Sequence, residues 1–264
     1  MQALAIMYHD VVENGDFASS GFPGEGAHVY KLRREDFELH LEAIRAATGQ
    51  DRVSTIARRR DLAGAPPVFL TFDDGGVTFF SPIAEMLERF GWRGHFFITT
   101  DRIGEPGFLS ETQLRELHRR GHVIGSHSCS HPTRMAALTP AELDREWRQS
   151  VARLAGILGE AVHVASVPGG FYSRQVGATA AAAGIEVLFT SEPTATVGEL
   201  NRCLVLGRYV VKRGMGAHWS GGFAAGKRGV RWRQTLLWTA KRVAKTLGGS
   251  AYLQVRRAIL ERKG

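Results

Sequence analysis

The stretch VFLTFDDGG, residues 68–76, runs from four apolar residues and a threonine straight into two adjacent aspartates and two glycines. Residues 68–72 form a short apolar run of the kind that makes a buried strand. Two neighbouring carboxylates repel each other, so we expect another group to hold both ionised or to give them different tasks. The doubled aspartate therefore marks the end of a strand and a candidate site at once.

Similar short apolar runs alternate with amphipathic segments as far as about residue 211. They predict seven strands, at residues 4–8, 68–72, 95–99, 122–125, 162–167, 185–190 and 204–211. The helices between them carry readable start signals, including capping boxes at Ser110 with Gln113 and at Thr139 with Glu142. This alternation predicts an α/β fold, and seven strands favour an incomplete, distorted (β/α)7 barrel with a basic helical C-terminal extension.

Charge divides the chain of 264 residues, whose net charge is +8. Residues 1–226 hold 23 basic and 25 acidic residues, whereas residues 227–264 hold eleven basic residues and one acid, Glu261. We therefore expect a barrel at 1–211, a glycine-rich linker at 212–226 and a basic amphipathic helical tail at 227–264. The balanced body argues against a nucleic-acid partner.

Two cysteines, Cys129 and Cys203, make a disulfide framework unexpected. The first residues lack the basic start of a secretory signal, and no apolar run approaches the roughly 20 residues of a membrane-spanning helix. The expected location is the cytoplasm, with peripheral association at the inner membrane face as an option.

Residues that can carry chemistry follow several predicted strands. His9 follows residues 4–8, Asp73 and Asp74 follow residues 68–72, and His127 and His131 follow residues 122–125. Because active sites of parallel α/β sheets lie at the carboxyl ends of the strands, we expect these side chains to meet. Asp74, His127 and His131 supply one oxygen and two nitrogens, an open ligand set that suits a divalent metal and that Zn²⁺ tolerates well. The neighbouring carboxylate is then free to act as a base.

Three motifs, TFDDG (71–75), SHSCSH (126–131) and VPGG (167–170), resemble the polysaccharide deacetylase family, also called the NodB-homology group or carbohydrate esterase family 4. The resemblance covers roughly residues 1–211. It implies an incomplete (β/α) barrel that removes N-acetyl groups, and sometimes O-acetyl groups, from sugars with one divalent metal, Zn first and Ni, Co or Mn as alternatives.

The resemblance also implies roles for single residues. Asp73 matches the general base of the family, and Asp74, His127 and His131 match its metal ligands. The loop at Gly169 and Gly170 resembles the segment whose backbone N–H binds the oxyanion. Phe171 and Tyr172 follow it, either as a stacking face for a sugar or as packing residues.

Two departures from the family pattern stand out. The usual arginine two residues before Pro168 is replaced by Ser166, and the usual late Leu-x-His is missing after residue 200. The opening MYHDV (7–11) resembles a circularly permuted subgroup, exemplified by poly-N-acetylglucosamine deacetylases, in which the strand bearing the acid histidine comes first. This resemblance implies His9 as general acid, oriented by Asp10, and leaves His218 as the alternative.

The expected function is hydrolysis of an N-acetyl or similar N-acyl group on an amino-sugar glycan or a lipid-linked sugar precursor. One alternative is a catalytically silent carbohydrate-binding relative, and another is a metal-dependent hydrolase of a small non-sugar amide or ester. In the tail, residues 231–247 are amphipathic at helical period, with Trp232 and Leu236 on the apolar face and Trp238 among the basic residues. They predict either an anionic-membrane surface helix or a helix packed on the barrel.

Overall fold

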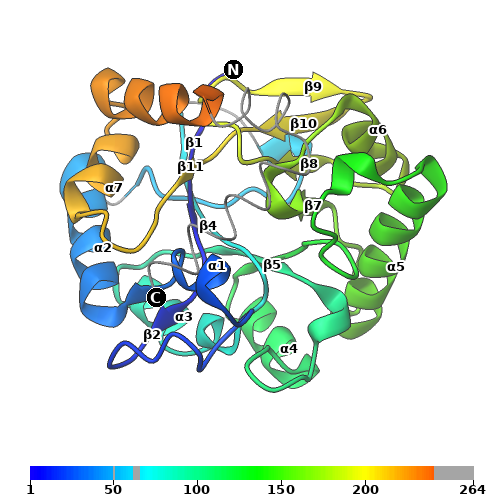
Figure 1. Cartoon of the computed structure of the whole chain (residues 1–264), viewed down its shortest axis with the longest axis horizontal. Coiled ribbons are helices and arrows are strands. Elements are labelled where there is room, and N and C mark those ends of the chain that lie inside the picture. Colours follow the sequence, from blue (N-terminus) through cyan, green and yellow to red (C-terminus); the bar gives the residue numbers. More distant parts are fainter. Residues whose placement is uncertain (50, 62–65, 241–264) are drawn as a thin grey trace.

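The structure is a computed structural model, and it describes residues 1–49, 51–61 and 66–240. Its main feature is a nine-stranded sheet that curls into an open barrel with helices around the outside (Figure 1). The strands are β1 Leu4–Tyr8, β2 Val11–Val12, β3 Leu32–Arg33, β4 Val68–Phe72, β5 His95–Ile98, β6 Val123–Ser126, β7 Val164–Ser166, β8 Val187–Phe189, β9 Gly198–Leu200, β10 Cys203–Leu206 and β11 Tyr209–Val210. The helices are α1 Glu25–His28, α2 Arg34–Thr48, α3 Ile83–Arg89, α4 Glu111–Arg119, α5 Pro140–Leu158, α6 Arg174–Ala182 and α7 Ala217–Ala224.

The strand order in the main sheet is β11-β1-β4-β5-β6-β7-β8-β10-β9. All neighbours in this order are parallel except β9, which pairs antiparallel with β10. No pairing joins β11 to β9 among the described residues, so the barrel stays open there. The predicted α/β class and incomplete barrel are confirmed.

The seventh predicted strand, residues 204–211, is divided into β10 and β11 by a break at Gly207 and Arg208. The backbone of Gly207 passes so close to the next loop that an added Cβ would lie 2.2 Å from the carbonyl oxygen of Glu192. Only glycine fits there, and the chain turns from one side of the barrel opening to the other. The break also brings Arg208 to the carboxyl end of the sheet.

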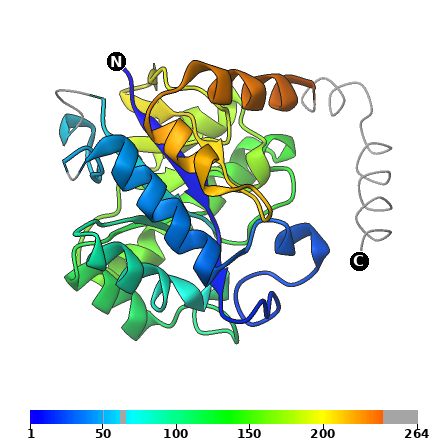
Figure 2. The ribbon, with the colours of Figure 1, turned by 90° about the vertical axis from the view of Figure 1, so that its left-hand side faces the viewer.

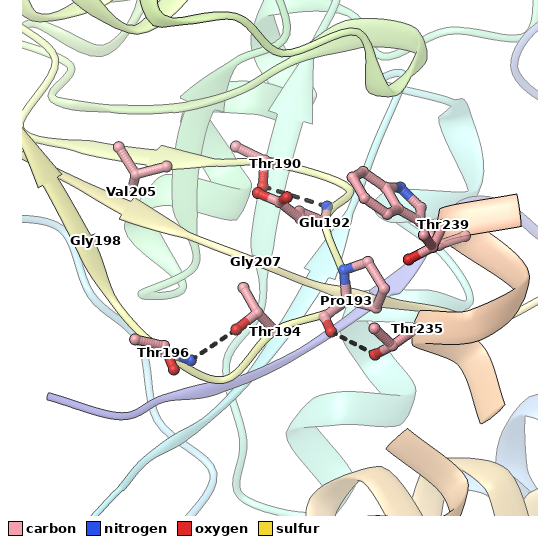
Figure 3. Close-up of a pocket in the computed structure, with 11 residues that line it drawn as sticks. Thr190, Glu192, Pro193, Thr194, Thr196, Gly198, Val205, Gly207, Thr235 and Thr239 are labelled. Carbon is pink, nitrogen blue, oxygen red and sulfur yellow. Dashed lines mark hydrogen bonds between the residues drawn. The ribbon is translucent and has the colours of Figure 1, made fainter. Parts of the chain in front are cut away.

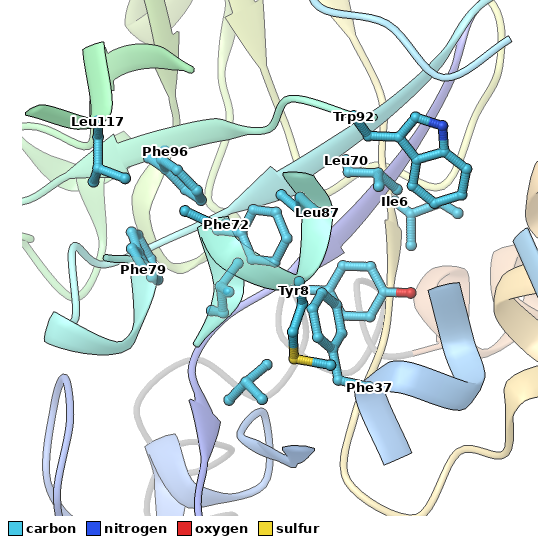
Figure 4. Packing of buried hydrophobic residues seen from close by; sticks show 14 of the residues in the cluster. Ile6, Tyr8, Phe37, Leu70, Phe72, Phe79, Leu87, Trp92, Phe96 and Leu117 are labelled. Carbon is cyan, nitrogen blue, oxygen red and sulfur yellow. The ribbon is translucent and has the colours of Figure 1, made fainter. Parts of the chain in front are cut away.

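Buried aromatic rings fill the space between the strands and the helices α2 and α3 (Figure 4). Tyr8 stacks on Phe72 with 5.6 Å between ring centroids, and Phe72 lies 5.3 Å from Phe96. Strands β1 and β4 are buried along their whole length, as expected for parallel strands covered on both faces. Their register pairs Tyr8 with Phe72, so the residues that follow, His9 and Asp73, emerge side by side.

The segment predicted as a linker, residues 212–226, needs correction because it contains helix α7. Phe223 and Ala224 are fully buried, and Gly221 packs so closely on α2 that an added Cβ would lie 2.9 Å from the carbonyl oxygen of Ala43. Ser220 accepts a hydrogen bond of 2.8 Å from the Tyr8 hydroxyl. Small residues allow this close helix packing, so a glycine-rich segment belongs to the body here rather than joining two parts.

A further helical segment, residues 228–240, follows α7 and lies along the outside of the body (Figure 2). The rest of the predicted tail, residues 241–264, lies outside the described residues. Within the described ranges, no helix combines the length and the apolar character needed to cross a membrane.

Candidate metal centre and catalytic site

The carboxyl ends of β1, β4 and β6 bring together His9, Asp73, Asp74 and His127, and the loop after β6 adds His131. Ligand atoms of Asp74, His127 and His131 all lie within 4.8 Å of one another. Oδ1 of Asp74 is 3.5 Å from Nε2 of His127 and 3.4 Å from Nε2 of His131. Three donors that converge on one point can share one divalent cation after small movements of the side chains. The structure therefore brings the three residues predicted as ligands together.

The tautomer of His127 fits this role. Its Nδ1 atom donates a hydrogen bond of 3.0 Å to the backbone carbonyl of Ser166. With the proton fixed on Nδ1, the lone pair of Nε2 points toward Asp74 and is available to a metal. The donor chemistry of the cluster thus fits a bound divalent ion.

The loop that carries His131 is held by a residue of helix α5. The Glu146 carboxylate accepts hydrogen bonds from the backbone N–H of Cys129 at 2.9 Å, from the N–H of Ser130 at 3.0 Å and from the Ser130 hydroxyl at 2.6 Å. The Ser128 hydroxyl accepts a further bond of 3.1 Å from the His131 N–H. Glu146 was not among the predicted site residues, because a glutamate on an amphipathic helix is normally expected to face solvent.

Backbone strain is concentrated in this cluster. Asp74, Ser128 and His131 have φ values of 92°, 64° and 56°, which non-glycine residues adopt only when their surroundings enforce it. Oδ1 of Asp74 faces the imidazoles of His127 and His131. The two neighbouring aspartates therefore bring two carboxylates to the same site, each with different partners.

Asp73 is clamped by a buried arginine. Arg208 binds both oxygens of the carboxylate, with Nη1 2.6 Å from Oδ1 and Nη2 2.7 Å from Oδ2. The remaining donors of the guanidinium bind Thr71, Ser166 and the carbonyl of Thr190, at 3.2, 2.7 and 3.0 Å. All five N–H groups of Arg208 are used, so the guanidinium and the carboxylate are fixed as one rigid unit.

Arg208 supplies the guanidinium that the family pattern would place at position 166. The sequence offers serine where the family pattern has arginine, yet the structure brings a guanidinium to Asp73 from the break between β10 and β11. The Ser166 hydroxyl lies 3.3 Å from Oδ2 of Asp73 and joins the same network. Sequence reasoning missed Arg208 because its strand was predicted to be continuous. An arginine preceded by glycine inside an apolar run was the available signal.

These contacts determine the ionisation of Asp73. Burial alone would raise the pKa of its carboxyl, but Arg208 and then His127 outweigh burial and hold the pKa below its usual value. Burial would raise the pKa of Asp74 as well, but the imidazoles of His127 and His131 beside it hold that pKa well below its usual value. Both carboxylates are consequently ionised at neutral pH.

His9 lies at this centre. Burial lowers the pKa of its imidazole, while the charges of Asp74 and Asp73 oppose that shift. Its ring packs on Tyr30 at a centroid distance of 4.8 Å, and its Nδ1 is buried without a hydrogen-bond partner among the described residues. His218, the alternative acid, is exposed at the start of α7 beside Trp219.

The predicted orienting role of Asp10 needs correction. Its carboxylate accepts hydrogen bonds from the hydroxyls of Ser20 at 2.5 Å and Thr78 at 2.7 Å. Oδ2 of Asp10 and Nδ1 of His9 are both buried without a hydrogen-bond partner among the described residues, so no such bond joins the two side chains there. Lys31, also buried, donates to three carbonyls of the loop at Phe17, Ser20 and Phe22. Asp10 and Lys31 therefore fix the loop over the site rather than the imidazole.

The loop after β7 contains Gly169 with φ 63° and Gly170 with φ 69°. Gly169 is exposed, which leaves its backbone accessible at the edge of the site. Phe171 lies under the guanidinium of Arg134 at 5.7 Å. Tyr172 packs against the cluster between α5 and α6, which favours a packing role for this ring.

Comparisons with known proteins agree with this geometry. A family model described as polysaccharide deacetylase matches residues 61–188, which include both aspartates, both histidines of the cluster and Gly169 but neither His9 nor Arg208. YxkH of Bacillus subtilis (strain 168) is 26% identical over 194 residues, 72% of this chain and 64% of YxkH. A chitin deacetylase of Colletotrichum lindemuthianum is 32% identical over 100 residues, 34% of this chain and 40% of that protein. The chain thus spans less than two thirds of these relatives.

Among solved structures, IcaB from Ammonifex degensii superposes with a TM-score of 0.64 at 20% identity, over 85% of this chain and 97% of that one. At this identity the likeness concerns the fold alone. The matched family model, the motifs it spans and the curated relatives agree with one another, and from them we conclude that residues 61–188 of this chain are of the polysaccharide deacetylase type.

Proposed function

We propose that this protein is a metal-dependent deacetylase that removes N-acetyl groups from an amino-sugar glycan or a lipid-linked amino-sugar precursor. The observation that carries the proposal is the pair of neighbouring aspartates, of which Asp74 faces two imidazoles and Asp73 faces Arg208. The named activity of the chitin deacetylase relative supports an N-acetylated sugar as substrate.

Asp74, His127 and His131 would hold the divalent ion, with zinc as the first choice and nickel, cobalt or manganese as alternatives. When bound, such an ion supplies Lewis acidity toward the acyl oxygen and lowers the pKa of water. The side chains of this chain supply the remaining steps.

Asp73, kept ionised and immobile by Arg208, takes a proton from the attacking water as general base. The backbone N–H of Gly169 donates a hydrogen bond to the oxygen that becomes negatively charged, a contribution of roughly 3 to 4 kcal/mol for such a donor. His9 then gives a proton to the departing amine, which leaves poorly as an anion. Each proton transfer of this kind typically contributes about 100- to 10,000-fold.

Release of acetate from chito-oligosaccharides and from lipid-linked amino sugars, measured with and without a chelator, tests this proposal. We expect chelator-sensitive acetate release from at least one of these substrates. A silent carbohydrate-binding relative would bind the oligosaccharides without releasing acetate. A hydrolase of small amides or esters would turn over acetamides or aryl acetates but not the sugars. Either result would contradict the proposal.

A further inference from the structure

Large apolar side chains are exposed on the helical segment 228–240. Among the described residues, five large apolar side chains are exposed, and three of them lie here: Trp232 at 66%, Leu236 at 48% and Leu237 at 56%. A concentration of exposed apolar residues on one element marks an interaction surface, whereas singly scattered ones do not.

The opposite side of this helix is tied to the body. The Gln234 side-chain amide forms two hydrogen bonds with the backbone of Val210 on edge strand β11, 3.0 Å from its N–H and 2.8 Å from its carbonyl. The Thr235 hydroxyl donates to the carbonyl of Pro193 at 3.0 Å. These bonds fix the rotation of the helix about its axis.

Two more residues of the segment, Trp238 and Thr239, line a pocket together with Thr235, Glu192 and Pro193 (Figure 3). At 100° per residue, positions 234, 235 and 238 lie opposite positions 232, 236 and 237. Trp238 therefore belongs to the side of the helix that meets the body, and the surface of Trp232, Leu236 and Leu237 points away from it. We refer to these three residues as the outer apolar face.

The charged residues of the segment that carries the outer apolar face are all basic. Residues 227–240 include Lys227, Arg228, Arg231 and Arg233 and no acidic residue. Arg231 donates to the Tyr209 hydroxyl at 2.8 Å, and Arg233 lies 5.3 Å above the ring of Trp219, so part of this charge is held in place by the body. Exposed apolar residues, a tryptophan among them, on a segment whose charged residues are all basic match an anionic bilayer surface.

We propose that residues 228–240 bind the surface of an anionic membrane, with Trp232, Leu236 and Leu237 inserted at the headgroup level and the basic side chains against the lipid phosphates. The helix lies in the plane of the surface and does not cross it. This inference does not depend on the proposed function, because its observable is binding and not acetate release.

Flotation of the full-length protein with lipid vesicles tests the proposal. We expect flotation with vesicles of phosphatidylcholine and phosphatidylglycerol, little flotation with phosphatidylcholine alone, and a decrease at high salt. The triple variant Trp232→Ser, Leu236→Ser, Leu237→Ser should lose about tenfold or more of the bound fraction. Leu39→Ser is the matched control, because Leu39 is 54% exposed on α2, and it should float like the wild type.

Equal flotation of the wild type and the triple variant, or no flotation of the wild type, would overturn the proposal. If the triple variant instead changes the oligomeric state in size-exclusion chromatography without affecting flotation, the outer apolar face is an interface between copies and the proposal is wrong. If only a chain truncated after Ala240 floats, residues 241–264 occupy the face, which also contradicts it. Thermal unfolding of each variant shows whether it is folded. The double variant Lys227→Gln, Arg228→Gln removes two positive charges and leaves every apolar residue in place, and it should reduce flotation.

Discussion

The guanidinium of Arg208 holds both carboxylate oxygens of Asp73, at 2.6 and 2.7 Å, across 135 positions of sequence. Both residues are buried, with exposures of 0% for Arg208 and 3% for Asp73. A buried charge pair of this kind is strongly destabilised when one partner is removed, because the other charge is left uncompensated. The pair therefore couples the geometry of the candidate base to the break between β10 and β11.

Arg208→Lys tests the importance of this clamp. Lysine keeps the charge but cannot hold two oxygens in one plane or supply five donors. We expect kcat for acetate release to fall about 10- to 100-fold, while the bound metal per chain is unchanged. Arg119→Lys, at an exposed arginine on α4, is the control and should leave kcat unaltered. A kcat equal to that of the wild type in Arg208→Lys would show that the clamp does not tune the base.

A second experiment tests whether an arginine at position 166 can replace Arg208 as the partner of Asp73. In Arg208→Ser the carboxylate of Asp73 loses its partner, and we expect a larger loss of kcat than in Arg208→Lys. Ser166→Arg in the Arg208→Ser background places a guanidinium where the family pattern has one, and Ser166 is already within hydrogen-bond distance of Asp73. The double variant should recover at least about tenfold in kcat over Arg208→Ser. A double variant no more active than the single one, although equally stable to heat, would argue against equivalent roles for the two positions.

Glu146 should act on the metal site through the loop that it holds. Glu146→Ala removes the acceptor for two backbone N–H groups next to His131, and we expect metal affinity to weaken about 10- to 100-fold. Glu146→Gln retains one carbonyl oxygen as an acceptor and should weaken the metal affinity less. Competition with a chromophoric chelator measures the affinity, and Asp144→Ala on the same helix is the control. Unchanged affinity in Glu146→Ala would remove Glu146 from the support of the site.

Acid stability should reflect His95, a buried histidine at the start of β5 and outside the candidate ligand set. Burial lowers the pKa of His95 to about 4 from the ordinary value of 6.5. Since the unfolded chain takes up this proton at higher pH than the folded one, the stabilisation is complete above pH 6.5 and is lost as the pH falls toward 4. The full effect is about 3 kcal/mol.

Urea unfolding between pH 7 and pH 4 measures this effect. His95→Gln should show a shallower loss of stability over this range than the wild type, whatever its stability at pH 7. The exposed His218→Gln serves as control and should follow the wild type. An equally steep loss in His95→Gln would assign the acid sensitivity to other groups.

Much of the barrel could be predicted because local signals and tertiary packing agree. Residues 4–8 and 68–72 were predicted as strands with the bounds of β1 and β4, and the capping boxes that begin α4 and α5 are formed by the predicted pairs. Apolar runs and capping residues act within a few positions of sequence, so they can be read without knowing the fold.

What could not be predicted depends on contacts distant in sequence. Arg208 reaches Asp73 where the strand breaks at Gly207, and the close approach of Gly207 to the carbonyl of Glu192 at this break is a contact between residues 15 positions apart. Glu146 on α5 binds the loop after β6, 16 to 17 positions earlier in the sequence. Helix α7 contains glycines, and it is stabilised by burial against α2. The roles of His9, Gly169 and the other site residues stay predictions, although the structure brings most of them together.

The central claim is that Asp74, His127 and His131 hold one divalent ion while Asp73 remains free to act on water. The most direct test is the metal content per chain of Asp73→Asn beside that of Asp74→Asn, measured by elemental analysis on the purified proteins. We expect Asp73→Asn to retain about one ion but to lose most acetate release, whereas Asp74→Asn should retain less than about a tenth of an ion. Loss of the ion from Asp73→Asn as complete as from Asp74→Asn would contradict the division of labour between the two aspartates.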